Sequence, residues 1–376
     1  MSRVWDVPVD DSTRVRDVRV AAEEASADAG LPAPRTATAA LVATELATNL
    51  LRHADGGRVV INLVERGQDG APETSVQIVS LDHGPGIPDI ATAMRDGYTT
   101  ASSLGAGLGT CRRIANDFDL HSAPGRGTVA VARIGHERAA KGAQASQGAQ
   151  RAQGPQGALR LPGPRVGGVN VPLGRAEYSG DAWSRVYGGD RVTLLLADGL
   201  GHGPKAAEAS GAAVAALPGV ADLPPAEILR HLGRTLRPTR GAAVAVAQLD
   251  LTSQQLSFAG IGNVSGRLRT DGTWKPLLSH PGIVGAQAPA SVPVQRVPWQ
   301  EDSLLVLHSD GLPGRWTPPD DGVLLSCDPA VVAVAVLRDA GSAALPVRDD
   351  TCVAVLGAGS GSGVDAGAGR WSGTGA

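Results

Sequence analysis

The chain has 376 residues, with 34 basic and 37 acidic side chains and a formal net charge of −3. That length is comfortable for two domains, each with its own hydrophobic core. A chain of this charge lacks the strongly basic face of a nucleic-acid binder, so we expect no nucleic-acid partner.

Targeting signals and cysteines also restrict the class of protein. Charged residues stand at the very N-terminus, and no apolar run approaches the roughly 18–20 residues of a membrane helix. The three cysteines, Cys111, Cys327 and Cys352, are too widely spaced for a disulfide framework or a zinc site. We therefore expect no leader peptide, no membrane contact, a cytoplasmic location and three buried thiols.

Two low-complexity stretches divide the chain. Residues 138–163 consist mainly of Ala, Gly, Gln and Arg and offer almost no large apolar side chains, which predicts a flexible linker. The stretch from about Gly357 is rich in Gly, Ser and Ala and is predicted to be a disordered tail. The expected domains are therefore residues 1–137 and 164–357, with the tail at 358–376.

In the first domain, Asp11 and Ser12 can cap a helix that ends near Gly30. Further elements are predicted in chain order from apolar periodicity and turn signals: a helix over 36–53, strands over 58–64 and 74–81, a helix over 112–118 and a strand over 128–134. This order favours helices packed on one face of a mixed sheet.

The second domain has a different pattern, in which short apolar strands recur between Gly- and Pro-rich turns. Strands are predicted over 192–197, 243–249, 303–307 and 352–356, and Ala-rich helices near 204–216, 225–236 and 329–340. The pattern is compatible with two packed sheets flanked by helices, so the chain as a whole belongs to the α+β class.

Three segments of the first domain carry possible ligand-binding chemistry. Glu45 and Asn49 are four apart on a predicted helix and share one face, although such pairs are usually solvated surface. Asp82 ends a strand in Asp82-His83-Gly84-Pro85-Gly86, where an acid can accept a hydrogen bond from an exocyclic amine and the glycines allow close approach. The loop Gly105-Ala-Gly-Leu-Gly-Thr110 opens the next helix and can offer backbone N–H groups to phosphates, but alone it is equally typical of a flexible turn.

Taken together with Ser122-Ala-Pro-Gly-Arg-Gly-Thr128, these segments resemble the GHKL ATP-binding family, and most closely the anti-sigma-factor serine kinases of the RsbW/RsbT type. The likeness covers nearly all of residues 10–135 and implies an N-terminal GHKL (Bergerat) α/β sandwich. It implies that Asn49 coordinates Mg²⁺, that Asp82 binds adenine beside Thr128, and that Glu45 is the general base toward a substrate serine. The further ATP contacts that it implies are Gly84, Gly86, Gly105, Gly107, Leu108 and Gly109.

The GHKL fold is shared by sensor histidine kinases, which need a helical hairpin with a phospho-accepting histidine. Only about 35 residues precede the helix of Glu45, too few for such a hairpin, so that alternative is disfavoured. A second alternative stays open. The N-terminal half can be a non-catalytic module that senses ATP or docks a partner and thereby regulates the rest of the chain.

Acidic residues mark four turns or strand ends of the second domain. Each alone is ordinary turn chemistry, since Asp-Gly is a favoured turn pair. In combination, carboxylates at loop starts suit hard cations such as Mg²⁺ or Mn²⁺, and two such ions can clamp a phosphate. The four segments are Gly180-Asp181, Asp198-Gly-Leu-Gly-His202-Gly, Ser309-Asp310-Gly and Asp349-Asp350.

The same set, with Arg240-Gly-Ala-Ala, Gly260-x-Gly-Asn263 and Gly282-Ile-Val-Gly285, resembles the PPM serine/threonine phosphatases of the SpoIIE/RsbX branch over about residues 165–356. The resemblance implies a C-terminal PPM α-β-β-α sandwich with two Mn²⁺ or Mg²⁺ ions. The ligands that it implies are Asp198 as the bridging carboxylate, the Gly199 carbonyl, Asp181, Asp310 and one of the closing pair, with Asp349 the better match and Asp350 the second choice. The spacing of His202 departs from the eukaryotic Asp-Gly-His pattern, which favours a turn role over a general acid.

The two resemblances together imply a signalling enzyme of a partner-switching pathway. The C-terminal domain is expected to dephosphorylate a phosphoserine-bearing STAS-type antagonist protein, and the N-terminal domain to bind ATP with Mg²⁺ and to act as the opposing serine kinase. A sigma factor or other switch protein is a further expected partner. Kinase-like relatives often dimerise, so the resemblance also allows a homodimer.

Overall fold

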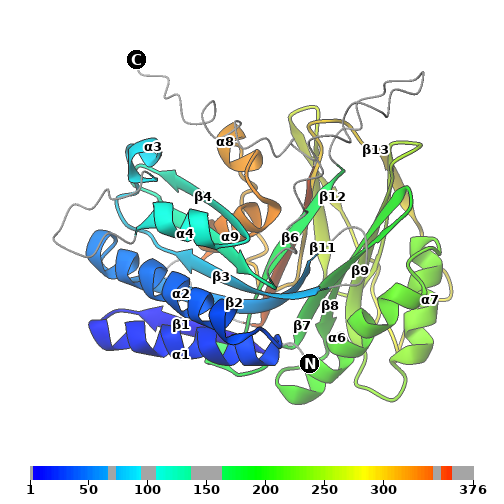
Figure 1. Cartoon of the computed structure of the whole chain (residues 1–376). Coiled ribbons are helices and arrows are strands. Elements are labelled where there is room, and N and C mark those ends of the chain that lie inside the picture. Colours follow the sequence, from blue (N-terminus) through cyan, green and yellow to red (C-terminus); the bar gives the residue numbers. More distant parts are fainter. Residues whose placement is uncertain (1–2, 67–72, 95–106, 137–162, 342–348, 358–376) are drawn as a thin grey trace, which may run out of the picture.

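The computed structural model describes residues 3–66, 73–94, 107–136, 163–341 and 349–357. The predicted linker over 138–163, apart from its last residue, and the predicted tail lie outside the described residues, as does Gly105. The described residues form three five-stranded sheets flanked by helices (Figure 1). This arrangement confirms the α+β class and the two-part organisation expected from the sequence.

The N-terminal half is one sheet covered by helices on one face. Its elements are β1 (Val4–Val9), α1 (Ser12–Asp28), α2 (Ala33–His53), β2 (Gly57–Arg66), β3 (Glu73–Leu81), α3 (Ile90–Ala93), α4 (Leu108–Ile114), β4 (Asp117–Ala123) and β5 (Gly127–Ile134). The strand order is β1-β2-β3-β5-β4, and every pairing among the described strands is antiparallel, where the sequence had suggested a mixed sheet. Apolar side chains of α1 and α2, including Val18, Val42 and Leu46, pack against Ile61 and Ile78 of the sheet.

Local signals placed most of these elements correctly, although the short helix α3 was not predicted and two further differences concern strands. The Asp11 carboxylate caps α1 by accepting from the Thr13 N–H at 2.7 Å, as the sequence predicted. Strand β1 was not predicted, and the helix predicted over 112–118 is wrong in its second half. That helix ends at Ile114, and Phe118 lies in β4 opposite Ala132 of β5, because the edge position beside β5 decides the conformation of this segment.

The C-terminal half is a sandwich of two sheets with helices on both outer faces. Its elements are β6 (Arg165–Val171), η1 (Leu173–Arg175), β7 (Asp181–Gly188), β8 (Arg191–Gly199), α6 (Pro204–Ala216), η2 (Leu217–Gly219), α7 (Pro225–Thr235), β9 (Ala242–Asp250), β10 (Gln255–Ile261), β11 (Ser265–Thr270), β12 (Thr273–Leu277), β13 (Gln295–Pro298), β14 (Leu304–His308), α8 (Gly322–Leu325), α9 (Pro329–Ala340) and β15 (Thr351–Gly357). The sheet orders are β13-β10-β9-β8-β7 and β12-β11-β14-β15-β6. Leu194 and Leu196 of the first sheet meet Leu305 and Leu307 of the second in the core between them.

Helix α9 lies between the two halves of the molecule (Figure 1). One buried cluster joins its valines to Val353 and Val355 of β15 on one side, and to Val60 and Val79 of the N-terminal sheet on the other. All residues from Pro329 to Arg338 are buried. A helix that is apolar all round needs such a position, because neither side can face water. The N-terminal sheet therefore covers the outer face of α9 and joins the two halves into one core.

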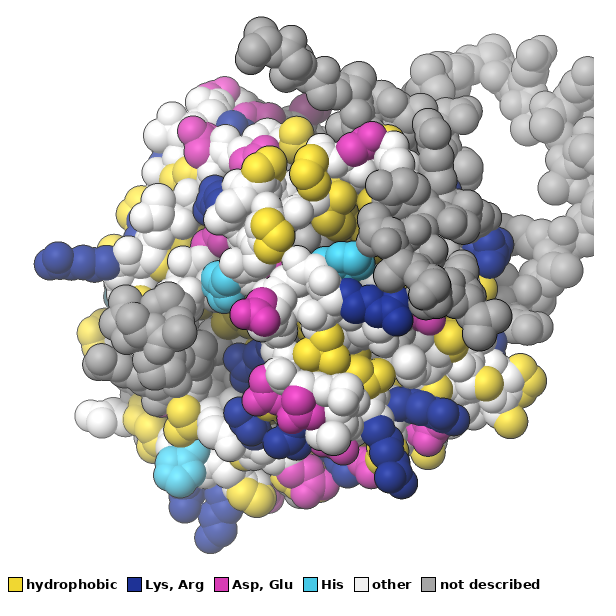
Figure 2. Space-filling model, turned by 90° about the vertical axis from the view of Figure 1, so that its left-hand side faces the viewer, with side chains coloured by type: hydrophobic (Ala, Val, Ile, Leu, Met, Phe, Trp, Pro, Cys, Tyr) yellow, Lys and Arg dark blue, Asp and Glu magenta, His cyan; other side chains and the backbone are white. Residues whose placement is uncertain are grey.

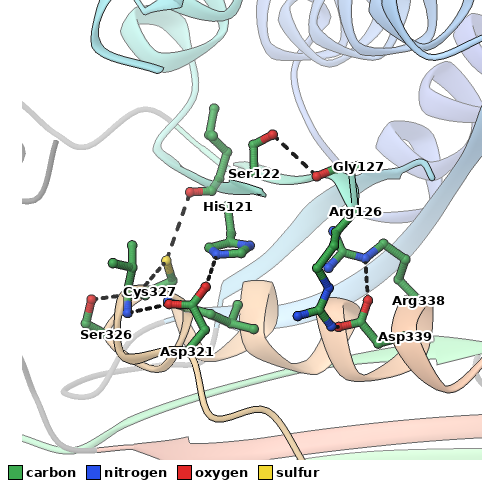
Figure 3. A network of polar contacts seen from close by, with 12 residues as sticks. His121, Ser122, Arg126, Gly127, Asp321, Ser326, Cys327, Arg338 and Asp339 are labelled. Atoms are coloured by element: carbon green, nitrogen blue, oxygen red, sulfur yellow. Dashed lines mark hydrogen bonds and ion pairs between the residues drawn. The ribbon is translucent and has the colours of Figure 1, made fainter. Parts of the chain in front are cut away.

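Polar contacts surround this apolar interface (Figure 3). The Arg133 guanidinium of β5 donates two hydrogen bonds to the Asp328 carboxylate at the start of α9, at 2.9 and 2.7 Å. Along the β4–β5 hairpin, His121 contacts Asp321 at 2.9 Å and Arg126 contacts Asp339 at 2.7 Å. The charged groups thus fix the register of the hairpin against α8 and α9.

The surface of the N-terminal half carries both signs of charge. Figure 2 shows Lys, Arg, Asp and Glu side chains interspersed over this face, with no large field of one sign. Among the described residues, no helix combines the length and the apolar character that crossing a bilayer demands.

Candidate functional site

Carboxylates from both C-terminal sheets gather at one end of the sandwich. Asp181 opens β7 and is the direct cross-strand partner of Asp198 near the end of β8. Asp310 follows β14 after one intervening residue, and Asp349 precedes β15, the neighbour of β14. The structure thus brings together the four acidic segments that the sequence singled out.

Burial and neighbouring charges raise the pKa values of these carboxyl groups. Burial raises the pKa of Asp181 well above its usual range, and the nearby Asp198 charge raises it further. Burial is also the largest cause that raises the pKa of Asp198, to about 7, followed by the charges of Asp310 and Asp349. A bound cation would offset this repulsion and favour the charged carboxylates.

The chemistry of the donor set fits a hard divalent cation. Asp181 is 1 % exposed and its Oδ2 atom is buried without a hydrogen-bond partner, an unsatisfied oxygen of the kind that an ion satisfies. In the described parts of the chain, however, no group of three or more His, Cys, Asp or Glu side chains already has the arrangement of a metal site. Asn263 donates a hydrogen bond to the Oδ2 atom of the Asp310 carboxylate, and the Oδ1 atom takes no part in that contact.

The closing acidic pair has two different environments. The carboxylate oxygens of Asp350 accept from the backbone N–H groups of Leu173 and Gly180, both at 2.8 Å, and the residue is 4 % exposed. Asp350 therefore ties the loop before β7 to the start of β15. Asp349 is exposed and raises the pKa of Asp198 and Asp310, while the Asp350 charge raises the pKa of Asp181 and Asp198. These environments favour Asp349 over Asp350 as the residue that faces a cation.

Gly199 and the histidines of this region have structural explanations. A Cβ atom at Gly199 would lie 2.0 Å from the Ala206 carbonyl oxygen, so α6 can approach β8 only at a glycine. His202 is exposed in the turn before α6. His308 is held between the Ser309 carbonyl and the Trp316 indole N–H, at 2.9 and 3.2 Å, and burial lowers its pKa.

Sequence reasoning missed the polar residues that hold the carboxylates. Ser309 precedes Asp310, accepts from the Cys352 N–H at 2.9 Å, and lowers the pKa of Asp181 through a hydrogen bond. Asn170 and Ser179 contact the backbone of Asp181, and Asn263 contacts Asp310. No spacing in the sequence distinguishes these residues from ordinary turn residues, although Asn263 stands in the Gly260-x-Gly-Asn263 segment.

The predicted nucleotide site of the N-terminal half centres on Asp82. Its Oδ1 atom accepts from the N–H groups of Gly84 at 2.8 Å and Thr128 at 3.1 Å, while burial raises its pKa against these two bonds. Glycine is required around it, since a Cβ at Gly127 would lie 2.1 Å from the Asp82 carbonyl oxygen. Gly86 has φ +77°, and a Cβ there would lie 2.4 Å from the Ala123 carbonyl oxygen.

The other predicted nucleotide residues lie on α2 and at the start of α4. Glu45 is half-buried, and burial raises its pKa, with the Arg52 charge acting in the opposite direction. The amide nitrogen of Asn49 is buried and has no hydrogen-bond partner, which fits a ligand on this face. Gly107 caps α4, and Leu108 and Gly109 form its first turn.

Two protein-family models match the chain. The model described as Stage II sporulation protein E (SpoIIE) matches residues 188–358, and the model described as Histidine kinase-like ATPase domain matches residues 9–133. Over 86 residues the chain is 42% identical to the serine/threonine-protein kinase RsbT of Bacillus subtilis (strain 168). This match covers 23% of the chain and 61% of the kinase, so less than two thirds of that relative is represented.

Solved structures that this chain is similar to include RsbX in complex with magnesium, with 19% identity and a TM-score of 0.44 over 51% of this chain and 94% of that one. The phosphatase domain of SpoIIE from Bacillus subtilis, with a fragment of its regulatory domain, gives 14% identity and a TM-score of 0.44 over 92% of this chain and 96% of that one. The assignment of the two halves rests on the family models. Residues 9–133 are similar to the histidine kinase-like ATPase domains, and residues 188–358 are similar to the SpoIIE family.

Proposed function

We propose that the C-terminal domain is a metal-dependent protein serine/threonine phosphatase. The observation that carries the proposal is the convergence of Asp181, Asp198, Asp310 and Asp349 from two sheets at one end of a SpoIIE-family sandwich. All four side chains supply oxygen ligands, which suits Mn²⁺ or Mg²⁺. Two such ions, when bound, lower the pKa of a water and neutralise the phosphate that it attacks.

The chain's own residues prepare this site. The cross-strand pairing of Asp181 with Asp198 sets the two carboxylates side by side, and Asp350 fixes the loop that leads to Asp181. Burial of Asp181 keeps it from bulk water, so the electrostatic interactions of a bound phosphate are stronger than in solvent. As substrate we propose a phosphoserine on a STAS-type antagonist protein, as the family resemblance implies, with a sigma factor or other switch protein as a further partner.

Manganese-dependent hydrolysis tests this proposal. The purified protein should release phosphate from p-nitrophenyl phosphate and from a phosphoserine STAS domain when Mn²⁺ is added, and chelation should stop the reaction. Asp198→Asn should lower kcat at least about 10²-fold, since it removes a charge that developing phosphate chemistry requires. Equal rates in Asp198→Asn and the unmutated protein would show that this aspartate is not a metal ligand.

For the N-terminal domain we propose ATP–Mg²⁺ binding, with Asp82 at the base and Asn49 near the metal, and phosphoryl transfer to a serine with Glu45 as the base. The raised pKa of Glu45 fits a proton acceptor. Glu45→Ala should abolish serine phosphorylation of a STAS domain while the affinity for ATP stays within about twofold.

The buried interface favours a second candidate role, in which the ATP domain regulates the phosphatase without catalysis. His83, next to Asp82, contacts the backbone carbonyl of Arg338 in α9 at 3.2 Å, so the nucleotide site and α9 are in direct contact. Phosphoryl transfer assays separate the two roles. If the unmutated protein transfers no phosphate to any of a panel of STAS domains, while ATP changes its phosphatase rate, the regulatory role holds.

A further inference from the structure

A line of hydrogen bonds runs from the N-terminal sheet to the backbone of Asp181. Asn62 of β2 donates through Nδ2 to the Asn170 carbonyl oxygen at 2.9 Å and accepts from the Asn170 N–H at 3.2 Å. Strand β6 lies at the edge of its sheet, so it has no neighbouring strand on this side. The Asn62 side chain of the N-terminal domain pairs with its backbone at Asn170 instead. Both asparagines are buried, at 5 and 4 % exposure, so neither bond competes with water.

The side chain of Asn170 continues this line to the metal site. Its Nδ2 atom donates to the Asp181 carbonyl oxygen at 2.7 Å, and its Oδ1 atom accepts from the Ser179 hydroxyl at 2.7 Å. Ser179 in turn accepts from the Asp181 N–H at 3.1 Å. Both peptide groups of Asp181 are therefore held by one buried network, and no polar atom of Asn170 is left unsatisfied.

The first strand holds the same segment from its other end. The Val4 N–H donates to the Glu177 carbonyl oxygen at 3.0 Å, and the Arg3 guanidinium lies 3.1 Å from the Glu177 carboxylate. Glu177 comes two residues before Ser179. The N-terminal half therefore contacts the approach to Asp181 at two separate places, through β1 and through β2.

We infer that the N-terminal domain is part of the machinery that positions the metal ligand Asp181, with Asn62 as the positioning residue that acts through Asn170. This inference rests on the proposed phosphatase function. Its physical basis is general: groups that surround a metal ligand and fix its position contribute about 10- to 100-fold to metal affinity, and Asn170 fixes the backbone from which the Asp181 side chain projects.

Gln77 provides a matched control. It is a second buried amide of the N-terminal sheet, 1 % exposed, and its Nε2 atom donates to the Gly168 carbonyl oxygen of β6 at 2.8 Å. It contacts the same strand from the same sheet, but its partner is not hydrogen-bonded to Asp181. A substitution at Gln77 therefore loosens the domain interface without interrupting the line from Asn62.

The experiment measures Mn²⁺ binding to the full chain, by titration calorimetry and by the electron paramagnetic resonance of free Mn²⁺, with p-nitrophenyl phosphate hydrolysis as a second readout. Asn62→Leu should raise the Kd for Mn²⁺ about tenfold. Gln77→Met should leave it within about twofold. At saturating Mn²⁺, the Asn62→Leu protein should recover most of its kcat, because the ligands themselves are intact.

A double-mutant cycle isolates the path through Asn170. In an Asn170→Ala background, Asn62→Leu should weaken Mn²⁺ binding no further, since the connection is already cut. Equal Mn²⁺ affinity in Asn62→Leu and the unmutated protein, or an equal loss in Gln77→Met, would overturn the inference and leave the proposed function standing. An unmutated protein that binds no Mn²⁺ would overturn the proposed function and this inference together.

Discussion

The buried ion pair between Arg133 and Asp328 should be a main determinant of how firmly the two domains hold together. Asp328→Ala removes the carboxylate, and the Arg133 guanidinium keeps the Gln77 side-chain oxygen, at 3.0 Å, and the nearby charges of Asp117 and Asp119. It also removes the helix cap at the Ala330 N–H, 2.9 Å from the same carboxylate. The Asp328 carboxyl and the Arg133 side chain are both largely buried, so solvent does not replace these contacts.

The magnitude follows from the pKa and from the unpaired charge. The Arg133 charge overcomes the burial of Asp328 and lowers its pKa from 3.8 to about 2, which corresponds to about 2 kcal/mol of stabilisation. Loss of the helix cap costs about 1 kcal/mol more. A guanidinium left buried without its partner brings the expected loss to about 3–5 kcal/mol. Because the folded-state pKa is depressed, this stabilisation is complete above about pH 4 and is lost as the pH falls toward 2.

Urea unfolding followed by tryptophan fluorescence measures this loss, and Trp316 reports on the same buried cluster. The double variant Arg133→Met with Asp328→Ala should lose less than Asp328→Ala alone, since the buried guanidinium is removed together with its partner. Glu23→Ala is the control. It breaks an exposed pair with Arg19 on α1 and should cost less than about 0.5 kcal/mol. A cost of less than about 1 kcal/mol for Asp328→Ala, or a double variant less stable than the single one, would refute this role of the ion pair.

Three further predictions concern the two sites. The metal-free protein should lose stability as the pH rises from about 4 to about 7. Burial and neighbouring charges raise the Asp198 pKa to about 7, so the folded state keeps a proton that the unfolded state releases. Thermal unfolding should show this fall in stability with pH, and Mn²⁺ should reverse it. Asp350→Asn should lower the melting temperature, because it disturbs the hydrogen bonds to the N–H groups of Leu173 and Gly180. Asp349→Asn should weaken Mn²⁺ binding with little change in melting temperature. If Asp350→Asn weakens Mn²⁺ binding and Asp349→Asn lowers the melting temperature, their roles are exchanged. Gly127→Ala should abolish binding of a fluorescent ATP analogue, because residue 127 has φ +87° and its Cβ would lie 2.1 Å from the Asp82 carbonyl oxygen. Gly125→Ala is the control: its φ is +73°, no atom lies within 4 Å of its Cβ, and it should retain binding. Equal affinity in the two variants would argue against Asp82 as the adenine residue.

The sequence alone indicated the elements and the residue types of both sites. Turn residues and apolar periodicity placed α1, α2 and the central strands of both halves within a few residues, because those signals are local. The acidic segments were recognisable because each stands at a turn or a strand end, and because their order along the chain resembles that of the PPM phosphatases. The buried state of all three cysteines was also predicted correctly.

The sequence did not reveal which surfaces meet. The run from Ala330 to Leu337 indicated an apolar helix, but its cover, the outer face of the N-terminal sheet, comes from residues 200 or more positions away. Likewise, Asp349 and Asp350 look alike in sequence, and only the backbone N–H groups of Leu173 and Gly180 separate their roles. Local propensity fixes helices and strands within a short window, whereas the pairing of distant faces depends on the free energy of burial summed over the whole fold.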